Sequence, residues 1–409
     1  MDVSICRACG APISREVINL GHMPLANSYI PDETMVSTER VYPLRVMVCT
    51  ECLLVQLDQS VPPEYVFSNY AYFSSYSTSW LAHCKAYVEM MCARFGLGPS
   101  SNVLEIASND GYLLQYFLAR KVPAIGVEPA QNVASVAISK GIPTKIAFFN
   151  EVFARTWAAE GYQADVIVSN NVLAHVPDTN NFVAGIPHVL QSEGVWTIEF
   201  PHLLELLNGV QFDTIYHEHY SYFSVLALER ILARHKLRAF DIERLPTHGG
   251  SLRVFVCHEA SKREACAGLH EVRVLEHAAR IDELTTYDQL QSDASKAKED
   301  FLTFVAQARQ NGQEIVGYGA AAKGNTFLNY CGISPKDITY VVDMNPVKQG
   351  TLLPGTHLPV LHPDEVAKTK PDYLLIIPWN LREEISTQLQ YIRSWGGRFV
   401  RAIPILEVF

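Results

Sequence analysis

The feature that most constrains the fold is a strand, turn and helix unit that occurs twice in the chain. The first unit occupies residues 102–119, where an apolar strand, a Ser-Asn-Asp-Gly turn and an apolar helix follow one another. The next strand, residues 124–127, ends in Glu128, where a doubly wound sheet offers a carboxylate to ribose hydroxyls. Further strands are predicted at residues 164–169, 194–200, 238–245 and 251–257, the last two as a hairpin. The middle of the chain is therefore predicted to be a Rossmann-like α/β sheet that binds a nucleotide.

The second unit, residues 314–326, runs from a strand through a turn of small residues into a helix. Backbone N–H groups and the helix dipole at such a turn face an anion, and Lys323 adds positive charge. The following strand, residues 338–343, ends in a carboxylate at the distance expected for a ribose contact. A second nucleotide site is predicted here, and a duplicated sheet that serves only packing is the alternative. The candidate substrate-binding residues are Gly319, Ala320, Lys323, Gly324, Asn325 and Asp343.

The length of 409 residues is too great for one ordinary core and indicates two or three domains. We expect an N-terminal module at residues 1–65, the nucleotide-binding sheet at 66–260 and a second Rossmann-like domain at 313–409. Between these sheets, residues 261–312 are charged and predicted to form a helical linker. Their apolar residues recur at helical spacing, at Leu269, Val272, Leu275, Ile281 and Leu284.

The charge pattern argues against a nucleic-acid partner. The net charge is −10, and no Lys/Arg run of the kind that follows a phosphate backbone is present. The sequence contains no apolar stretch of the roughly 18 to 20 residues that span a bilayer. Residues 1–15 lack the basic start and apolar centre of a signal peptide. We therefore expect a cytoplasmic chain without a membrane partner, and no obligatory protein partner is predicted.

Four of the nine cysteines form two Cys-x-x-Cys pairs, Cys6 with Cys9 and Cys49 with Cys52. Two intervening residues allow both sulfurs of a pair to approach one tetrahedral zinc ion at about 2.3 Å. Gly10, which follows the first pair, suits a knuckle turn at positive φ. Two redox pairs or two disulfides are the alternative. A four-cysteine site leaves no open coordination position, so the predicted zinc is structural.

The turn at residues 108–111 lacks the Gly-x-Gly-x-x-Gly of dinucleotide-binding folds. The pattern Glu105-x-Ala107-x-Asn109-x-Gly111 instead resembles the first motif of class I methyltransferases, with Ala and Asn in place of two glycines. Asn tolerates left-handed backbone, and Ala is the smallest other side chain. The resemblance implies an S-adenosylmethionine pocket, whereas a plain turn without a ligand is the alternative. The candidate cofactor-binding residues are Glu105, Ala107, Asn109, Asp110, Gly111, Glu128 and Asn170.

Polar and aromatic residues gather at two places where ligands of such sheets lie. His175 follows the third strand, past its carboxyl end. The densest cluster comes later, at residues 213–222, and its spacing is not that of the His-Glu-x-x-His zinc proteases. Tyr216 and His219 are three apart and can share a face, with Glu218 as an orienting group for His219. A solvent-exposed segment with unrelated histidines is the alternative.

Taken together, these motifs resemble the C-methyltransferases that act on nucleotide-linked deoxy-keto sugars. The resemblance covers the whole chain and rests on the paired Cys-x-x-Cys start and on four further motifs. These are Glu105-Ile-Ala-Ser-Asn-Asp-Gly111, Tyr216-His-Glu-His219, His248-Gly-Gly-Ser251 and Gly317-Tyr-Gly-Ala-Ala-Ala-Lys-Gly-Asn-Thr326. It implies S-adenosylmethionine in the middle domain and a nucleotide-linked keto sugar between the middle and last domains. The implied catalytic residues are Tyr216, Glu218, His219, His175 and Tyr70, and His248, Gly249 and Ser251 join the substrate-binding set.

The resemblance also implies a mechanism. A 4-keto group acidifies the neighbouring C3 proton of a 4-keto-6-deoxy sugar, a base removes this proton, and the enolate carbon takes the methyl group. His219 is the predicted base, because a neutral imidazole can accept that proton. Tyr216 or His175 is predicted to donate a hydrogen bond to the enolate oxygen. An O- or N-methyltransferase acting on a nucleotide sugar and a non-catalytic zinc protein that senses one are the alternatives.

Overall fold

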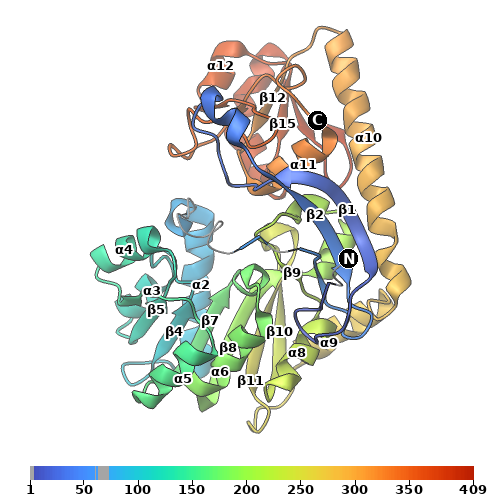
Figure 1. The fold of residues 1–409 in the computed structure, drawn as a ribbon. Helices are drawn as coiled ribbons and strands as arrows, with labels where there is room; N and C mark the ends of the chain where they lie inside the picture. The colour runs from blue at the N-terminus through green and yellow to red at the C-terminus, as the bar shows by residue number, and fades with distance from the viewer. Residues whose placement is uncertain (1–3, 60, 63–72) are drawn as a thin grey trace.

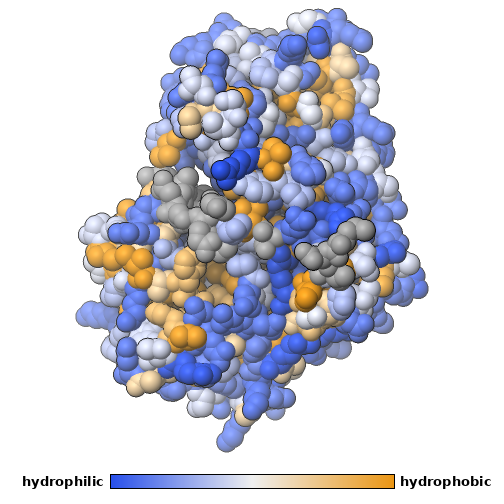
Figure 2. Space-filling model, in the orientation of Figure 1, coloured by the Kyte–Doolittle hydropathy of each residue, from blue (hydrophilic) through white to orange (hydrophobic). Residues whose placement is uncertain are grey.

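The computed structural model describes residues 4–59, 61–62 and 73–409, and it arranges them around three sheets. In Figure 1 the C-terminal sheet lies above the central one, and the long helix α10 (Gln289–Gln310) runs along one side of the molecule. Hydrophilic residues predominate on the face in Figure 2, where hydrophobic residues form small separate patches. Among the described residues, no helix has both the length and the apolar character needed to cross a membrane.

The first sheet has the strand order β1-β2-β3-β9 and is antiparallel throughout. Its strands are β1 (Arg15–Pro24), β2 (Val41–Val48), β3 (Val55–Leu57) and β9 (Ser221–Tyr222). The last strand comes from the middle of the chain and joins the N-terminal strands by pairing with β3. This pairing fixes the segment before β9, which contains the predicted catalytic cluster, against the N-terminal region.

The central sheet has the order β6-β5-β4-β7-β8-β11-β10, with β11 antiparallel to both of its neighbours. The strands are β4 (Val103–Ile106), β5 (Ala124–Val127), β6 (Thr144–Lys145), β7 (Ala164–Asn170), β8 (Leu190–Pro201), β10 (Leu237–Leu245) and β11 (Ser251–His258). All of β4 is buried, as expected for a parallel strand covered on both faces. The predicted parallel sheet with a closing hairpin is thus confirmed.

Eight α-helices accompany this sheet among the residues that the structure describes. They are α2 (Thr78–Phe95), α3 (Leu114–Ala119), α4 (Gln131–Ser139), α5 (Glu151–Ala159), α6 (Thr179–Val189), α7 (Leu203–Asn208), α8 (Val225–Arg234) and α9 (Ala267–Ala278). Helix α9 packs on β10, and its buried Glu276 accepts hydrogen bonds from the N–H groups of Val225 and Leu226, at the start of α8. The stretch that we predicted as a linker therefore begins as part of the central core. Leu275, predicted on its apolar face, is instead exposed.

The third sheet has the order β14-β13-β12-β15-β16-β17 and is parallel except for β17. Its strands are β12 (Ile315–Tyr318), β13 (Val341–Val342), β14 (Val360–Leu361), β15 (Tyr373–Ile376), β16 (Arg398–Arg401) and β17 (Glu407–Val408). Its helices are α11 (Ala322–Cys331), α12 (Glu365–Thr369) and α13 (Arg382–Gln388). The second α/β unit is confirmed, although the strand predicted at residues 338–343 is only two residues long.

Between β1 and β2 the chain makes an excursion of residues 25–40, which we call the bridging segment. It contains the 3-10 helix η1 (Glu33–Thr38) and lies beside the C-terminal sheet in Figure 1. Ile30 exchanges two backbone hydrogen bonds with Leu352, of 3.0 and 2.8 Å. The Glu39 carboxylate accepts from the Gly355 N–H at 2.8 Å and lies 3.0 Å from Nε2 of His357. The N-terminal region is therefore fastened to the C-terminal sheet.

Candidate active site and metal centre

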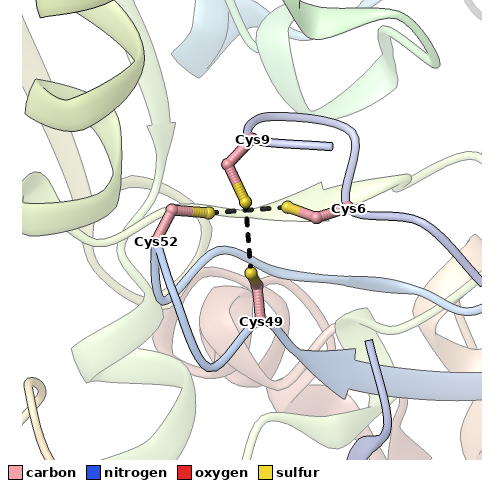
Figure 3. Close-up of side chains that lie close together, drawn as sticks. All are labelled: Cys6, Cys9, Cys49 and Cys52. Carbon is pink, nitrogen blue, oxygen red and sulfur yellow. Dashed lines mark hydrogen bonds between the residues drawn. The ribbon is translucent and has the colours of Figure 1, made fainter. Parts of the chain in front are cut away.

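The four predicted zinc ligands meet in one place, as Figure 3 shows. The sulfurs of Cys6, Cys9, Cys49 and Cys52 all lie within 4.8 Å of one another, and the shortest separations are 3.4 and 3.5 Å. Sulfurs around a tetrahedral zinc ion with bonds of about 2.3 Å are about 3.8 Å apart. Disulfides would need about 2.05 Å, so the alternative of two disulfides does not fit this geometry. The donor set and its spacing fit zinc.

The two cysteine pairs form equivalent knuckle turns. Gly10 has φ 74° and donates its N–H to the Cys6 carbonyl, while Leu53 has φ 62° and donates to the Cys49 carbonyl. The expected glycine conformation is confirmed in the first turn. In the second turn a leucine adopts the same left-handed backbone, which is costly for a bulky residue. Its side chain is 5% exposed, so burial in the core offsets part of that cost.

Gln56 is a further residue of the metal centre that the sequence did not reveal. Its side chain is fully buried, and its amide Nε2 lies 3.1 Å from the Cys6 sulfur. Its Oε1 accepts a hydrogen bond of 2.9 Å from the Arg7 N–H. An N–H donor to a sulfur favours the thiolate form that binds a metal.

The predicted cofactor turn follows β4 directly. Ala107, Asn109 and Gly111 have φ angles of 57°, 48° and 79°, so all three alternate positions of the motif are left-handed. Ala and Asn thus adopt the conformation for which glycine is the usual residue. At Gly111 a Cβ atom would lie 2.2 Å from Cδ1 of Ile142, so a side chain there would also be crowded.

Glu128, at the end of β5, fastens this turn. Its carboxylate accepts hydrogen bonds from the N–H groups of Asn109, at 2.9 Å, and Ala130, at 2.8 Å. Burial raises the pKa of Glu128, and it raises that of Glu105 well above its usual range. Asp110 is also buried, and Lys140 donates to its carboxylate at 3.3 Å. These contacts give the turn a fixed shape at the carboxyl ends of adjacent strands, where ligands of such sheets bind.

Asn170 ends β7, the strand next to β4, and points polar atoms into a buried position. Its side chain is 5% exposed, and both of its amide atoms lack a hydrogen-bond partner among the described residues. Asp110 Oδ1 is also without such a partner. Buried polar atoms are nearly always paired in native proteins. A polar ligand held by the turn, Glu128 and Asn170 would satisfy these atoms, so the residues present fit S-adenosylmethionine.

His219 and Tyr216 form a hydrogen-bonded pair. His219 Nδ1 lies 2.8 Å from the Thr214 carbonyl, which can only accept, so this nitrogen carries the proton. Nε2 is therefore the acceptor for the Tyr216 hydroxyl, also at 2.8 Å. The two residues meet through a turn in which the His219 N–H donates to the Tyr216 carbonyl, rather than on one face of a helix.

Two further histidines belong to the same cluster. The rings of His175 and His219 are 4.7 Å apart in an edge-to-face contact. Burial lowers the pKa of His219 well below its usual value, and the nearby His175, His248 and Lys323 lower it further. Burial likewise lowers the pKa of His175 and of His248 to about 4. These three histidines are therefore neutral near pH 7.

The proposed orienting role of Glu218 toward His219 is wrong. Both ring nitrogens of His219 are engaged by Thr214 and Tyr216, and the Glu218 carboxylate turns to the N-terminal region. There it accepts a hydrogen bond of 2.6 Å from the Asn27 side chain. Burial raises the pKa of Glu218 to about 7. Glu218 and His219 are neighbours in sequence, but in this turn their side chains bind different partners.

The hairpin between β10 and β11 brings His248 to this cluster. His248 has φ 56°, and its Nε2 lies 3.4 Å from the amide nitrogen of Asn171, the residue after β7. Gly249 packs against Trp379, and a Cβ there would lie 2.3 Å from its ring. The Ser251 hydroxyl donates to the Thr247 carbonyl within the hairpin. Of the three predicted residues, His248 lies against Asn171 and the Trp80 ring and is close enough to His175 and His219 to interact with them electrostatically. The contacts of Gly249 and Ser251 stabilise the loop and its docking.

The predicted substrate-binding residues that follow β12 lie in the turn after this strand, at the start of α11 and at the end of β13. Gly319 and Gly324 lie against Pro378 and Ile377, where a Cβ would come within 2.6 and 2.1 Å, so packing explains both glycines. Asp343 accepts hydrogen bonds from the N–H groups of Ala320 and Asn345, both at 2.8 Å, as Glu128 does in the first unit. Asn325, predicted to bind substrate, donates its amide to the Ala26 carbonyl of the bridging segment.

Lys323, in the first turn of α11, is the charged group of this unit. Its Nζ donates to Asn380 Oδ1 at 2.7 Å and lies 4.6 Å from the centre of the Trp379 ring. Burial lowers its pKa, while the carboxylate of Asp213 opposes that shift. Asp213 accepts from the Trp379 indole N–H at 2.7 Å, and burial raises its pKa to about 6. Lys323 also lies close enough to His219 and His248 to lower their pKa values, so it borders the histidine cluster from the C-terminal side.

Three models of protein families match the chain. They describe a zinc binding domain at residues 6–67, a methyltransferase domain at residues 83–239 and a C-methyltransferase C-terminal domain at residues 246–404. Among characterised proteins, the C-methyltransferase NovU of Streptomyces niveus is 33% identical over 98% of this chain and 95% of its own length. This chain belongs to the C-methyltransferase family.

Other similarities cover a smaller part of the chain. A ubiquinone biosynthesis O-methyltransferase of Bartonella quintana is 28% identical over 27% of this chain and 48% of its own length. A solved magnesium protoporphyrin IX methyltransferase of Synechocystis with bound S-adenosylmethionine is 12% identical, with a TM-score of 0.34 over 44% of this chain and 79% of that one. A solved S-adenosylmethionine-dependent methyltransferase from Clostridium acetobutylicum is 11% identical, with a TM-score of 0.35 over 44% of this chain and 92% of that one.

The methyltransferase thus has two non-protein components, S-adenosylmethionine as methyl donor and zinc in the N-terminal region. Sequence reasoning located most of the side chains that the structure brings together, but it missed several partners. Asn27, Asp213 and Trp379 had no motif to mark them, and only Asp213 lay inside a noted cluster. Tyr70, predicted as a catalytic residue, lies outside the described residues.

Proposed function

We propose that this methyltransferase moves the methyl group of S-adenosylmethionine to C3 of a nucleotide-linked 4-keto-6-deoxy sugar. The observation that carries the proposal is the hydrogen bond between Tyr216 and the neutral His219, within a half-buried polar cluster. Methylation at carbon needs a carbanion equivalent, and a keto group supplies one when a base removes the neighbouring proton. A C-methyltransferase therefore needs a base and a donor to an oxyanion side by side.

His219 is the proposed base. Its Nδ1–H is fixed by the Thr214 carbonyl, so the lone pair on Nε2 is the one available for a proton. Because its pKa lies well below 6.5, the imidazole is neutral near pH 7 and ready to accept. The developing imidazolium would be held in place through the same Nδ1–H bond.

Tyr216 is the proposed donor to the enolate oxygen. Its hydroxyl donates to Nε2 of His219 in this structure, so a bound substrate has to draw it away from that nitrogen. A hydroxyl that moves to the keto oxygen would free the base and stabilise the developing charge in one step. A preorganised donor of this kind contributes about 2.7–4 kcal/mol to the transition state.

The residues proposed to hold S-adenosylmethionine are those of the β4 turn, Glu128 and Asn170. When bound, this cofactor supplies an electrophilic methyl group. The chain's part is to present the substrate carbon to this methyl group and to limit the access of water. Asn171 and His248, next to Asn170 in the fold, are proposed to line the passage between cofactor and sugar.

Lys323 is proposed to attract the diphosphate of the sugar nucleotide. A lysine ammonium is a compact point charge that binds phosphate oxygens well. Asp213 lies near Lys323 and supplies negative charge, which helps to keep the half-buried ammonium protonated. The proposal therefore sets the nucleotide against the C-terminal sheet and the sugar ring against the histidines.

The decisive experiment offers the protein labelled S-adenosylmethionine and a small panel of 4-keto sugar nucleotides carrying deuterium at C3. Methylation at C3 predicts transfer of the label together with complete loss of that deuterium. An O- or N-methylated product would retain the deuterium and would refute C3 as the acceptor. A non-catalytic sugar-nucleotide sensor predicts that no label is transferred to any member of the panel.

A further inference from the structure

The bridging segment reaches the catalytic cluster through one side chain. Asn27 donates its amide Nδ2 to Glu218 Oε1 at 2.6 Å. Asn27 is half-buried and Glu218 is 4% exposed, so the contact lies at the inner edge of the segment. Glu218 is flanked by His217 and His219, and a hydrogen bond links the His175 ring to its backbone. A side chain from the N-terminal region thus contacts Glu218 within residues 216–219, which we call the catalytic segment.

Helix α11 sets the position of both partners. Asn325 donates its side-chain amide to the carbonyl of Ala26, the residue before Asn27. Thr326, the next residue of the helix, donates its hydroxyl at 2.9 Å to the carbonyl of Ile215, the residue before Tyr216. Both α11 side chains are 1–2% exposed. Two consecutive residues of one buried helix therefore hold the two segments that meet at Asn27 and Glu218.

The bridging segment has further anchors on the same side. The Tyr29 hydroxyl donates at 2.5 Å to the Ala320 carbonyl, which also accepts from Lys348 at 2.6 Å. Ile30 and Glu39 bind the C-terminal sheet as described above. The position of Asn27 therefore depends on how the C-terminal sheet docks. Because Asn27 binds Glu218, the position of the catalytic segment depends on this docking as well.

The contact also has an electrostatic consequence. A buried carboxylate without a donor is expensive, and an amide N–H favours its ionised form. Among the residues that the structure describes, the titratable groups around Glu218 are the histidines named above and the phenol of Tyr29. Burial lowers the pKa of each of these histidines and raises that of Tyr29, so none of these groups adds a positive charge near pH 7. The Asn27 amide is accordingly the hydrogen-bond donor that lowers the pKa of this carboxyl against the effect of burial.

We propose that Asn27 is a positioning residue of the methyl transfer, which orients the Glu218 carboxylate and keeps the catalytic segment in register with the docked C-terminal sheet. The N-terminal region would then contribute to the reaction as well as to stability. The kinetic part of this inference rests on the proposed function, whereas the contact and its effect on Glu218 do not depend on the substrate.

The first test measures Glu218 directly and needs no substrate. Protein labelled with carbon-13 at the glutamate side-chain carboxyl is titrated by NMR, with Glu218 assigned by its loss in Glu218→Gln. Asn27→Ala should move the Glu218 midpoint upward by about one pH unit. Asn27→Asp, which keeps the shape but adds a carboxyl, should move it further. Ser28→Ala, at the exposed neighbouring position, is the matched control and should leave it unchanged.

The second test is a double-mutant cycle in turnover. Asn27→Ala should lower kcat on the order of tenfold while KM for the sugar nucleotide changes little. The same change in a Glu218→Ala background should have no further effect, because Asn27 acts through Glu218. Melting temperature and zinc content are compared with those of Ser28→Ala, to separate positioning from folding.

Failure of the proposed function and failure of the inference on Asn27 would give different results. A wild-type protein that methylates no 4-keto sugar nucleotide would overturn the proposed function, while the NMR titration would still decide the role of Asn27. Titration and melting curves of Asn27→Asp and Asn27→Ala that match Ser28→Ala would overturn this inference, whatever the substrate proves to be. Additive kinetic effects in the cycle would likewise overturn it.

Discussion

The hydroxyl of Tyr216 lies 2.8 Å from Nε2 of His219 and donates a hydrogen bond to it. The lone pair that accepts this bond is the one that the proposed mechanism needs for the C3 proton. A substrate must therefore compete for the Tyr216 hydroxyl before His219 can act, and a keto oxygen is a suitable competitor. In the proposed mechanism, His219 is therefore the base and Tyr216 the hydrogen-bond donor to the enolate oxygen.

These two roles predict different effects of substitution on the exchange of the C3 proton. His219→Gln should abolish exchange of the C3 proton with solvent, because the base is gone. Tyr216→Phe should slow exchange by about 10²–10³-fold, because the base remains and only the donor to the oxygen is lost. Both variants should bind S-adenosylmethionine with unchanged affinity, as calorimetry can show. Wild-type exchange in His219→Gln would assign the base role to another group.

The raised pKa of Glu218 predicts an unusual dependence of stability on pH. Between its ordinary value of 4.5 and the folded value of about 7, the folded state binds more protons than the unfolded state. Stability contributed by this group is therefore lost as pH rises through that window, to a total of roughly 3 kcal/mol. Glu218→Gln cannot ionise, so it should melt at a higher temperature than wild type at pH 8 and at a similar one at pH 4.5.

The control for that prediction is Glu299→Gln, which changes an exposed glutamate of α10. It should follow the wild-type melting curve at both pH values. If Glu218→Gln melted below wild type at pH 8, the buried carboxylate would be stabilising, and the assigned direction of its pKa would be wrong.

Local patterns explain why much of the fold could be predicted. Runs of apolar residues that end in small-residue turns identified the strands β4, β5, β7 and β12, because periodicity is a property of neighbouring residues. The cysteine pairs predicted their own cluster for the same reason, since two residues of spacing suffice for a knuckle. Ala107 and Asn109 could be matched to glycine positions because few other side chains tolerate that backbone.

Contacts between residues that are far apart in sequence could not be predicted in this way. Glu218 and Asn27 are 191 residues apart, and nothing in either neighbourhood indicates the other. The tautomer of His219 is set by the backbone carbonyl of Thr214, which is invisible in a side-chain pattern. β9 has only two residues, and its pairing with β3 decides where the catalytic segment lies. Strands this short carry almost no periodic signal.

Lys323 and Asp213 should show coupled effects on stability and independent effects on binding. Lys323→Gln leaves the Asp213 carboxylate buried without its nearby cation and should destabilise the fold by roughly 1–3 kcal/mol. Adding Asp213→Asn should recover most of that loss. The double variant should nevertheless keep a KM for the sugar nucleotide raised about tenfold or more, because the phosphate-binding charge is absent. A normal KM in the stable double variant would remove Lys323 from the substrate site.

Zinc removal should affect more than the N-terminal sheet. Cys9→Ser is expected to lose the metal, since three thiolates hold zinc less tightly than four. Hydrogen exchange should then increase in β1 and β2. Turnover should fall because Asn27, between these two strands, is no longer held in place. Cys92→Ser, at a half-buried cysteine outside the cluster, should retain one zinc per chain and full protection. Full zinc content in Cys9→Ser, by metal analysis, would contradict a four-cysteine site.

Two glycines with nearly the same backbone provide a test of the cofactor turn. Gly111 has φ 79° and Gly141 has φ 77°, so alanine at either position meets similar backbone strain. A Cβ at Gly141 would meet no atom within 4 Å, whereas one at Gly111 would meet Ile142 at 2.2 Å. Both variants should therefore lose about 1 kcal/mol to strain, and Gly111→Ala more through crowding.

Binding should separate the two variants further. Gly111→Ala displaces the β4 turn and should weaken binding of S-adenosylmethionine by tenfold or more, a factor equivalent to about 1.4 kcal/mol. Gly141→Ala lies beyond α4 and should bind the cofactor as the wild type does. Calorimetric titration of both proteins with S-adenosylmethionine, at a temperature well below their melting points, measures the difference. Equal affinities would mean that the turn after β4 does not form the cofactor site, and the site would then have to be sought at another edge of the central sheet.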